Sequence, residues 1–257
     1  MRNLYDYPKY YNLLFGNRNF KKECKFIQKL FEKYSKIKVS SILDIACGNG
    51  MHIIEFTKLG YKIAGLDISE KMLNETNKRL ENNPNLIKLY HKDMVSFYLD
   101  KKFDACICMV NSLEILNKDT EFISNFNSVA DALNEGGLYI IELDNPNLIK
   151  NNDQIKEYKK IIKKGKITIN LIYKKYPFDY KTKLEKNELI LNVDEDGKRL
   201  KIVDNSPIRR LTIEDINYFV NKTKRFEIMD VINDFNLNLN VKDKSPNKII
   251  VVLKKIS

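Results

Sequence analysis

The chain has 257 residues, of which 43% are hydrophobic, and a formal net charge of +11. That length is enough for one sizeable core, or for one domain with an insertion, and no apolar run approaches the length that spans a bilayer. The N-terminus carries no secretory signal pattern, and the four cysteines match neither a zinc site nor a disulfide framework. We therefore expect a reduced, cytoplasmic protein with no metal site.

The excess positive charge is concentrated between residues 150 and 211, which hold 17 lysines and arginines against nine aspartates and glutamates. A basic segment can contact nucleic acid, a membrane surface or a phosphorylated ligand. Lysine is abundant throughout the chain, however. The alternative is therefore that a compositional bias supplied these lysines and that they are solvated and bind no partner.

The first half of the chain alternates short apolar runs with helical patterns, which is typical of a parallel sheet wrapped by helices. The expected strands are 41–46, 62–67, 86–93, 103–109 and 138–143. The expected helices are 19–35, 50–59, one that begins after Ser69, and 119–133.

The pattern changes after Pro146. Residues 166–176, 183–193 and 198–205 alternate apolar and polar side chains between turn signals, which favours antiparallel strands. A helix at 212–220 and strands at 226–231 and 248–254 complete the chain. We predict an α/β protein with a doubly wound, mostly parallel, seven-stranded Rossmann-like sheet. Residues 1–149 and 212–257 form this domain, and an antiparallel β cap at 150–211 is inserted after the fifth strand.

A glycine-containing turn, residues 44–50, joins the first expected strand to the next helix. Glycine lets the backbone approach a ligand closely, and in an open α/β sheet this turn lies at the mouth of the ligand crevice. A dinucleotide-binding turn would have a third glycine where Ile53 stands. Asp44 also suits a ligand with ammonium and sulfonium groups better than a phosphate.

Two further aspartates follow the next strands. Asp67 ends the second strand, where a carboxylate can accept hydrogen bonds from both hydroxyls of a ribose. Asp93 ends the third strand and could accept from an adenine amino group, with Ile68 and Met94 as apolar walls. The alternative is that all three aspartates only cap helices and form turns.

Together, residues 44–50, 65–73, 92–94 and 133–137 resemble the ordered motifs of class I S-adenosylmethionine-dependent methyltransferases. Within this class the cap pattern and the tyrosine-rich residues 10–15 resemble a small-molecule branch. That branch includes the N,N-dimethyltransferases of nucleotide-linked amino sugars. The resemblance implies transfer of a methyl group from S-adenosylmethionine to N or O of a small molecule, with S-adenosylhomocysteine as the product.

The resemblance also implies roles for particular residues. It places the cofactor against Arg18, Asp44, Ala46, Gly48, Gly50, Asp67, Ile68, Asp93, Met94 and Met109. Arg18 either meets the cofactor carboxylate or is a solvated charge at a helix start. Tyr11 either lies over the transferred methyl group or packs between helices.

The general base of the reaction has no clear counterpart. Amino-sugar enzymes carry a histidine after the fourth strand, and the corresponding position is Ile115. Glu114 either substitutes as a catalytic base or is a surface glutamate, and an amine could also arrive already neutral. We expect His52 and His91, the two histidines of the chain, to be structural.

The acceptor is expected to lie under the cap, where Arg209 and Arg210 would bind an anionic substrate. We expect a small-molecule acceptor without a membrane partner, and a homodimer is left open. A methyltransferase of RNA or protein is the alternative, although the clamp for an exocyclic base amine and an RNA-binding module are both missing. A non-catalytic S-adenosylmethionine-binding protein is a third alternative.

Overall fold

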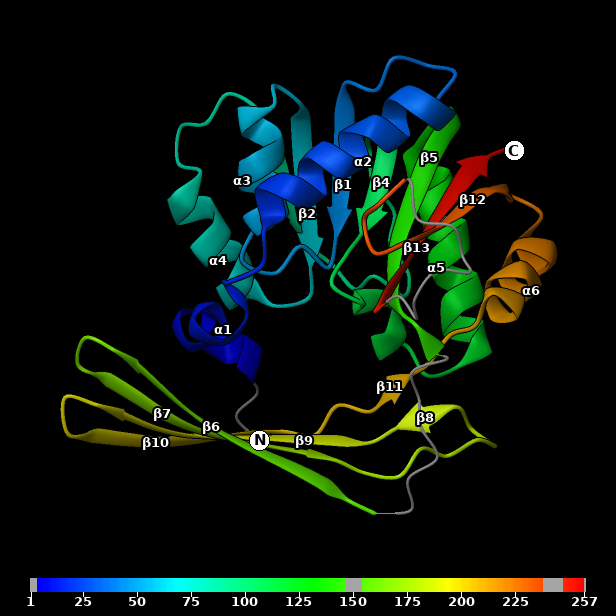
Figure 1. Cartoon of the computed structure of the whole chain (residues 1–257). Helices are drawn as coiled ribbons and strands as arrows, with labels where there is room; N and C mark the ends of the chain where they lie inside the picture. The colour runs from blue at the N-terminus through cyan, green and yellow to red at the C-terminus, as the bar shows by residue number, and fades with distance from the viewer. Residues whose placement is uncertain (1–3, 147–153, 238–246, 257) are drawn as a thin grey trace.

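The computed structural model describes residues 4–146, 154–237 and 247–256. The cap boundary predicted at residue 150 lies outside these residues. Figure 1 shows an α/β body with a separate antiparallel sheet beneath it, and helix α1 (Pro8–Phe15) lies between the two parts.

The body is built on a seven-stranded sheet with the strand order β12-β13-β5-β4-β1-β2-β3. Strand β13 runs antiparallel to both of its neighbours, and the pairs among the first five strands are parallel. The mostly parallel, seven-stranded sheet expected from the sequence is thereby confirmed. The strands are β1 (Ser41–Ile45), β2 (Lys62–Asp67), β3 (Leu86–His91), β4 (Phe103–Cys108), β5 (Leu133–Asp144), β12 (Phe226–Asn233) and β13 (Lys248–Lys255).

Helices cover both faces of this sheet, so both faces are buried. Along β1, Ile42 packs into the cluster formed with α2 and α3, whereas Leu43 packs into the cluster formed with α5 and α6. The helices are α2 (Phe20–Tyr34), α3 (Met51–Lys58), α4 (Glu70–Arg79), α5 (Asp119–Ala132) and α6 (Ile213–Thr223). Among the described residues, no helix is long and apolar enough to cross a membrane.

The cap is a four-stranded antiparallel sheet with the order β10-β9-β7-β6. Its strands are β6 (Lys156–Lys164), β7 (Ile167–Lys175), β9 (Asn187–Glu195) and β10 (Lys198–Asp204). A short pair, β8 (Leu184–Glu185) and β11 (Ile208–Arg209), connects the cap to the body. Strand β6 was not predicted from the sequence, because it is an exposed, lysine-rich edge strand without alternation of apolar and polar residues.

The N-terminal segment packs on the cap, although the sequence analysis grouped it with the body. Leu4 and Tyr10 belong to the same hydrophobic cluster as Ile169, Leu191 and Ile202 of the cap sheet. This cluster buries one side of α1, and the other side of the helix faces the carboxyl ends of β1 and β4.

Candidate active site

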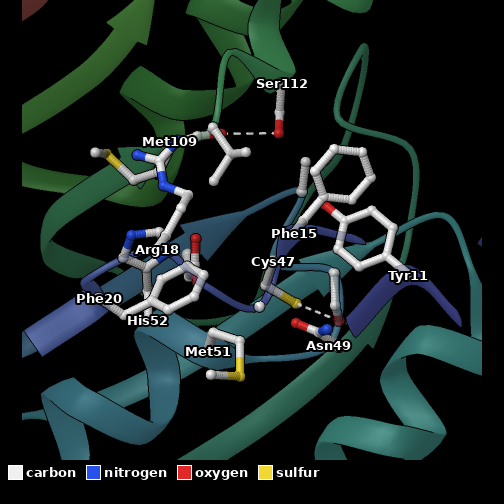
Figure 2. Close-up of a pocket in the computed structure, with 15 residues that line it drawn as sticks. Tyr11, Phe15, Arg18, Phe20, Cys47, Asn49, Met51, His52, Met109 and Ser112 are labelled. Carbon is white, nitrogen blue, oxygen red and sulfur yellow. Dashed lines mark hydrogen bonds between the residues drawn. The ribbon is translucent and has the colours of Figure 1, made fainter. Parts of the chain in front are cut away.

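A cavity lies at the carboxyl ends of β1 and β4, beneath the N-terminal segment. Figure 2 shows Arg18, Phe20, His52 and Met109 on one side of it and Tyr11, Phe15 and Asn49 on the other. Six residues that the sequence analysis assigned to the site line this cavity: Tyr11, Arg18, Asp44, Ala46, Gly48 and Met109.

The turn after β1 shapes the floor of the cavity. Ala46, Gly48 and Gly50 all have positive φ angles, of 55°, 53° and 75°. At Gly50 a Cβ atom would lie 2.4 Å from Cγ2 of Thr76, so both conformation and space require glycine there. At Gly48 a Cβ would meet nothing within 4 Å, so the left-handed conformation is the local reason for glycine.

Asp44 lies at the base of the cavity and is only 2% exposed. Its Oδ2 atom is buried and has no hydrogen-bond partner among the described residues. Burial raises the pKa of this carboxyl group to about 7, and nearby Asp67 adds to the shift, whereas His52 partly opposes it. A buried carboxylate without a partner is costly, and a cationic ligand group would remove that cost. The site therefore fits the ammonium and sulfonium end of S-adenosylmethionine.

Asp67 supports the same turn from the end of β2. Its carboxylate accepts hydrogen bonds from the backbone N–H of Gly48 at 2.7 Å and of Ser69 at 2.8 Å. Burial raises the pKa of Asp67, although these two bonds oppose the shift. The carboxylate does not line the cavity itself, and each oxygen keeps acceptor capacity for a further donor.

The residues predicted around an adenine ring lie outside the cavity. Asp93 is exposed, and its carboxylate accepts a hydrogen bond from the N–H of Val95 at 2.8 Å. Ile68 is 67% exposed, and Met94 is half-buried. Asp93, Ile68 and Met94 follow neighbouring parallel strands at one edge of the sheet, and their contact with an adenine stays a prediction.

Arg18, in the loop between α1 and α2, is not a solvated charge, because it is bonded to two glutamates. Its Nε donates to Glu23 at 2.9 Å, and its Nη1 and Nη2 donate to the two oxygens of Glu142 at 3.0 and 2.8 Å. The second oxygen of Glu23 lies 2.9 Å from Nε2 of His52. Burial alone would raise the pKa of Glu23, but hydrogen bonds with His52 and Arg18 hold it below its usual value.

The turn after β4 forms another wall of the cavity. Val110 and Asn111 both have left-handed backbones, with φ angles of 57° and 56°. The N–H of Val110 donates to Glu142 at 2.8 Å, and the hydroxyl of Ser112 donates to the carbonyl of Met109 at 2.8 Å. A positive φ is a strained conformation for a β-branched residue such as valine, so these contacts hold an unusual turn in place.

Tyr11 lines the cavity and packs against two aromatic rings, Tyr5 at 5.7 Å and Phe15 at 4.9 Å between centroids. Burial raises the pKa of its phenol to about 12, with a further contribution from Asp67. The hydroxyl is therefore protonated at neutral pH and can donate a hydrogen bond into the cavity, but it does not act as a base.

Glu114 is completely buried, so the alternative of a surface glutamate is wrong. Its carboxylate accepts from Arg210 at 3.2 Å and from the backbone N–H groups of Asp144 and Leu211. Burial raises its pKa to about 7, against the opposing effect of Arg210. The side chain is not part of the cavity lining, and a role as catalytic base stays a prediction without geometric support.

The two arginines predicted to bind the acceptor are engaged by acidic side chains. Arg210 is buried and pairs with Glu114, Asp144 and Glu185. Arg209 pairs with Asp119 at 2.6 Å, and its guanidinium lies 5.2 Å from the centre of the Phe122 ring. Neither lines the cavity, so their predicted contact with an anionic acceptor has no support in this geometry.

Glu23 and Glu142, which hold Arg18, were not among the residues predicted for the site. A signal for Glu142 was present, since it is a lone acid within the apolar run of β5, residues 138–143. A glutamate in a strand buried on both faces needs a partner, and only the folded chain shows which one it has.

Comparisons with known proteins identify relatives of the part of the chain that carries this site. A family model described as a methyltransferase domain matches residues 42–137, which contain the glycine turn and all three aspartates. A dTDP-3-amino-3,4,6-trideoxy-alpha-D-glucopyranose N,N-dimethyltransferase of Streptomyces venezuelae is 39% identical over 103 residues, or 40% of this chain and 42% of the relative. A glycine/sarcosine N-methyltransferase of Aphanothece halophytica is 28% identical over 126 residues, or 48% of this chain and 46% of the relative.

The similarity in structure extends over the cap. A crystal structure of an S-adenosylmethionine-dependent methyltransferase from Clostridium acetobutylicum ATCC 824 has a TM-score of 0.80 and 19% identity, and the match covers 95% of each chain. Sequence matches to these curated relatives span less than half of each relative. Residues 42–137 thus match a methyltransferase domain, and the described chain has the fold of class I methyltransferases, as the sequence motifs predicted.

Proposed function

We propose that this protein transfers a methyl group from S-adenosylmethionine to a small-molecule amine. The observation that carries the proposal is the buried Asp44 carboxylate at the base of a cavity formed by the glycine turn. Its Oδ2 atom has no hydrogen-bond partner within the described part of the chain. Because the two relatives described above are both named as N-methyltransferases, a nitrogen acceptor is favoured over oxygen.

The residues of the site divide the binding of the cofactor between them. Asp44 pairs with the ammonium group, and Arg18 meets the carboxylate from the opposite side of the methionine part. Asp67 accepts from the ribose while it holds the turn at Gly48. Charge complementarity supports this arrangement, since an acidic side chain, Asp44, and a basic side chain, Arg18, line one cavity.

Bound S-adenosylmethionine supplies a methyl group on a sulfonium, and the leaving group is a neutral thioether that needs no acid. The chain must align the acceptor and exclude water. Tyr11 and Phe15 cover the cavity from α1, and the protonated hydroxyl of Tyr11 orients the acceptor. An amine that arrives neutral needs no strong base, which agrees with Ile115 at the position of the family's histidine.

The relatives support a class of acceptor, not one particular compound. A nucleotide-linked amino sugar is the acceptor named for the Streptomyces venezuelae relative, and we propose an acceptor of that class.

The four cysteines are free, which supports a reducing compartment such as the cytoplasm.

Ligand binding tests the cofactor assignment. Isothermal titration calorimetry with S-adenosylhomocysteine and NAD should show binding of the first ligand only. Asp67→Ala should weaken S-adenosylhomocysteine at least tenfold, because two charge-assisted hydrogen bonds are worth on the order of 2–4 kcal/mol. Stronger binding of NAD, or a loss below threefold in Asp67→Ala, would contradict the proposal.

Turnover tests the acceptor. The protein is incubated with cofactor labelled in the methyl group and with dTDP-linked 3-amino sugars, with glycine, with RNA, or without acceptor. We expect label in the amino-sugar fraction, and mass spectrometry then counts the methyl groups. Label in RNA alone would overturn the small-molecule assignment, whereas binding without any turnover would indicate a non-catalytic protein.

A further inference from the structure

One carboxylate, that of Glu142 in β5, joins two walls of the cavity that are far apart in the chain. It is fully buried and accepts three hydrogen bonds, two from the guanidinium of Arg18 and one from the backbone N–H of Val110. Arg18 precedes α2, whereas Val110 follows β4. Glu142 itself does not line the cavity.

A charge at this position is expensive for folding. β5 is an interior strand of the sheet, between β13 and β4, and Ile140, Ile141 and Leu143 beside Glu142 are all fully buried. A buried carboxylate needs charged and hydrogen-bonded partners to offset its desolvation. Arg18 supplies the charge, and Lys248 contributes a second one at 3.6 Å. Since an apolar residue would fill the strand at lower cost, the arrangement points to a role beyond stability.

The geometry leaves part of Arg18 free for a ligand. A guanidinium has five N–H donors. Within the described chain, Nε donates one to Glu23, and Nη1 and Nη2 each donate one to Glu142. Two N–H groups remain on a side chain whose plane is held from two directions and which lines the cavity. Such a fixed guanidinium loses less entropy when it binds a carboxylate.

The same carboxylate also fixes the adjacent wall, formed by the turn after β4. Val110 lines the cavity in a left-handed conformation, with φ of 57°, and its N–H points to Oε2 of Glu142 at 2.8 Å. Oε2 also accepts Nη2 of Arg18. A shift of either wall would therefore break a bond to the oxygen that holds the other.

We propose that Glu142 is a positioning residue that sets Arg18 and the Val110 turn for recognition of the cofactor carboxylate. This inference rests on the proposed function, because it assigns the carboxylate of S-adenosylmethionine to Arg18. Glu142 touches neither cofactor nor acceptor. It acts through the orientation of Arg18 and through the spacing between the two walls.

The test compares S-adenosylmethionine with its decarboxylated form, which keeps the sulfonium and the amine but has no carboxylate. In Glu142→Gln, we expect the Kd of S-adenosylmethionine to rise at least tenfold and the Kd of the decarboxylated form to change less than threefold. Arg18→Gln should show the same selectivity. The double variant should lose little more than either single variant, because both act on one interaction.

The matched control is Glu185→Gln, which changes another fully buried glutamate paired with an arginine, in the cap junction instead of beside the cavity. It should leave both Kd values unchanged. If Glu142→Gln does not fold, Glu142→Asp retains the charge but draws the carboxylate back from Arg18 and Val110, and the same selective loss is expected.

Parallel losses for both ligands, or no loss for either, would overturn the role of Glu142. Failure of the wild-type protein to bind S-adenosylmethionine or S-adenosylhomocysteine would instead overturn the proposed function. The two failures are therefore distinguishable within one set of titrations.

Discussion

Asp44 combines a cost to folding with a gain in binding. Its pKa is about 7 in the folded protein and near 3.8 when exposed, because burial disfavours the ionised form. Because the pKa of Asp44 is higher in the folded protein than in the unfolded chain, Asp44 makes the ligand-free fold more stable at low pH than at high pH. That contribution is lost as pH rises from about 4 to 7.

Cofactor binding should therefore depend on pH through Asp44. Pairing with an ammonium group requires the ionised carboxylate. With a pKa of about 7, this form predominates in the ligand-free protein only when the pH is above that value. Affinity for S-adenosylhomocysteine should rise about tenfold between pH 6 and pH 8, with release of a proton below pH 7. Calorimetry at pH 6, 7 and 8, in buffers of different ionisation enthalpy, measures both quantities.

Asp44→Asn serves as the control for this linkage. The variant should bind weakly at every pH and should melt at a higher temperature than the wild type at pH 8, with a smaller difference at pH 5. Pronounced pH dependence of binding that survives in Asp44→Asn would assign the titration to another group.

At the scale of elements, α1 connects the cap to the cofactor cavity. Lys9 and Tyr10 both bond to Glu195 at the end of β9, and Asn12 bonds to Asn49 of the glycine turn. The same helix presents Tyr11 to the cavity. The cap therefore influences the cavity through a helix that packs on its sheet.

Removal of the contact at Glu195 should loosen this helix. In Glu195→Ala, amide hydrogens of residues 8–15 should exchange several-fold faster with deuterium, because two side-chain anchors are lost, while the body of the protein keeps its protection. Glu188→Ala is the matched control, since Glu188 lies on the same strand and pairs with Lys174 instead of α1. Equal exchange in both variants would show that the apolar cluster alone holds α1.

At the scale of the whole molecule, the junction between cap and body depends on Arg210. This buried side chain pairs with Glu114 from the short 3-10 helix after β4, with Asp144 at the end of β5 and with Glu185 of β8. Glu114 and Glu185 are themselves fully buried, so the junction has more acid than Arg210 alone neutralises. Lys175 lies 2.6 Å from Glu185 and supplies further positive charge.

Loss of Arg210 should therefore affect stability more than catalysis. Arg210→Gln leaves buried carboxylates without their main partner and should cost about 3–5 kcal/mol in the free energy of unfolding. Arg209→Gln breaks a pair with the more exposed Asp119 and should cost about 1 kcal/mol. Chemical denaturation measures both values. A stable Arg210→Gln with a much higher KM for the acceptor would restore the anion-binding role predicted from the sequence.

Local sequence was sufficient for the fold of the body and for the floor of the site. Apolar runs and helix signals predicted most elements to within a few residues, since both are short-range properties of the chain. The aspartates after the first two strands could be placed at one edge because parallel strands end together. Asp44 indeed lines the cavity beside the glycine turn, and Asp67 holds this turn through the N–H of Gly48.

Only the tertiary structure decided which charges meet. Arg18 and Glu142 are 124 residues apart, and Lys9 and Glu195 are 186 apart, so no local pattern relates them. The sequence therefore left Arg18 as a cofactor ligand or a solvated charge, Glu114 as a base or a surface residue, and Arg210 as an anion-binding side chain. In the folded chain all three are held in ion pairs. Composition determines how many charges the chain carries. Burial and pairing decide what each charge does, because a desolvated group is governed by the few atoms around it.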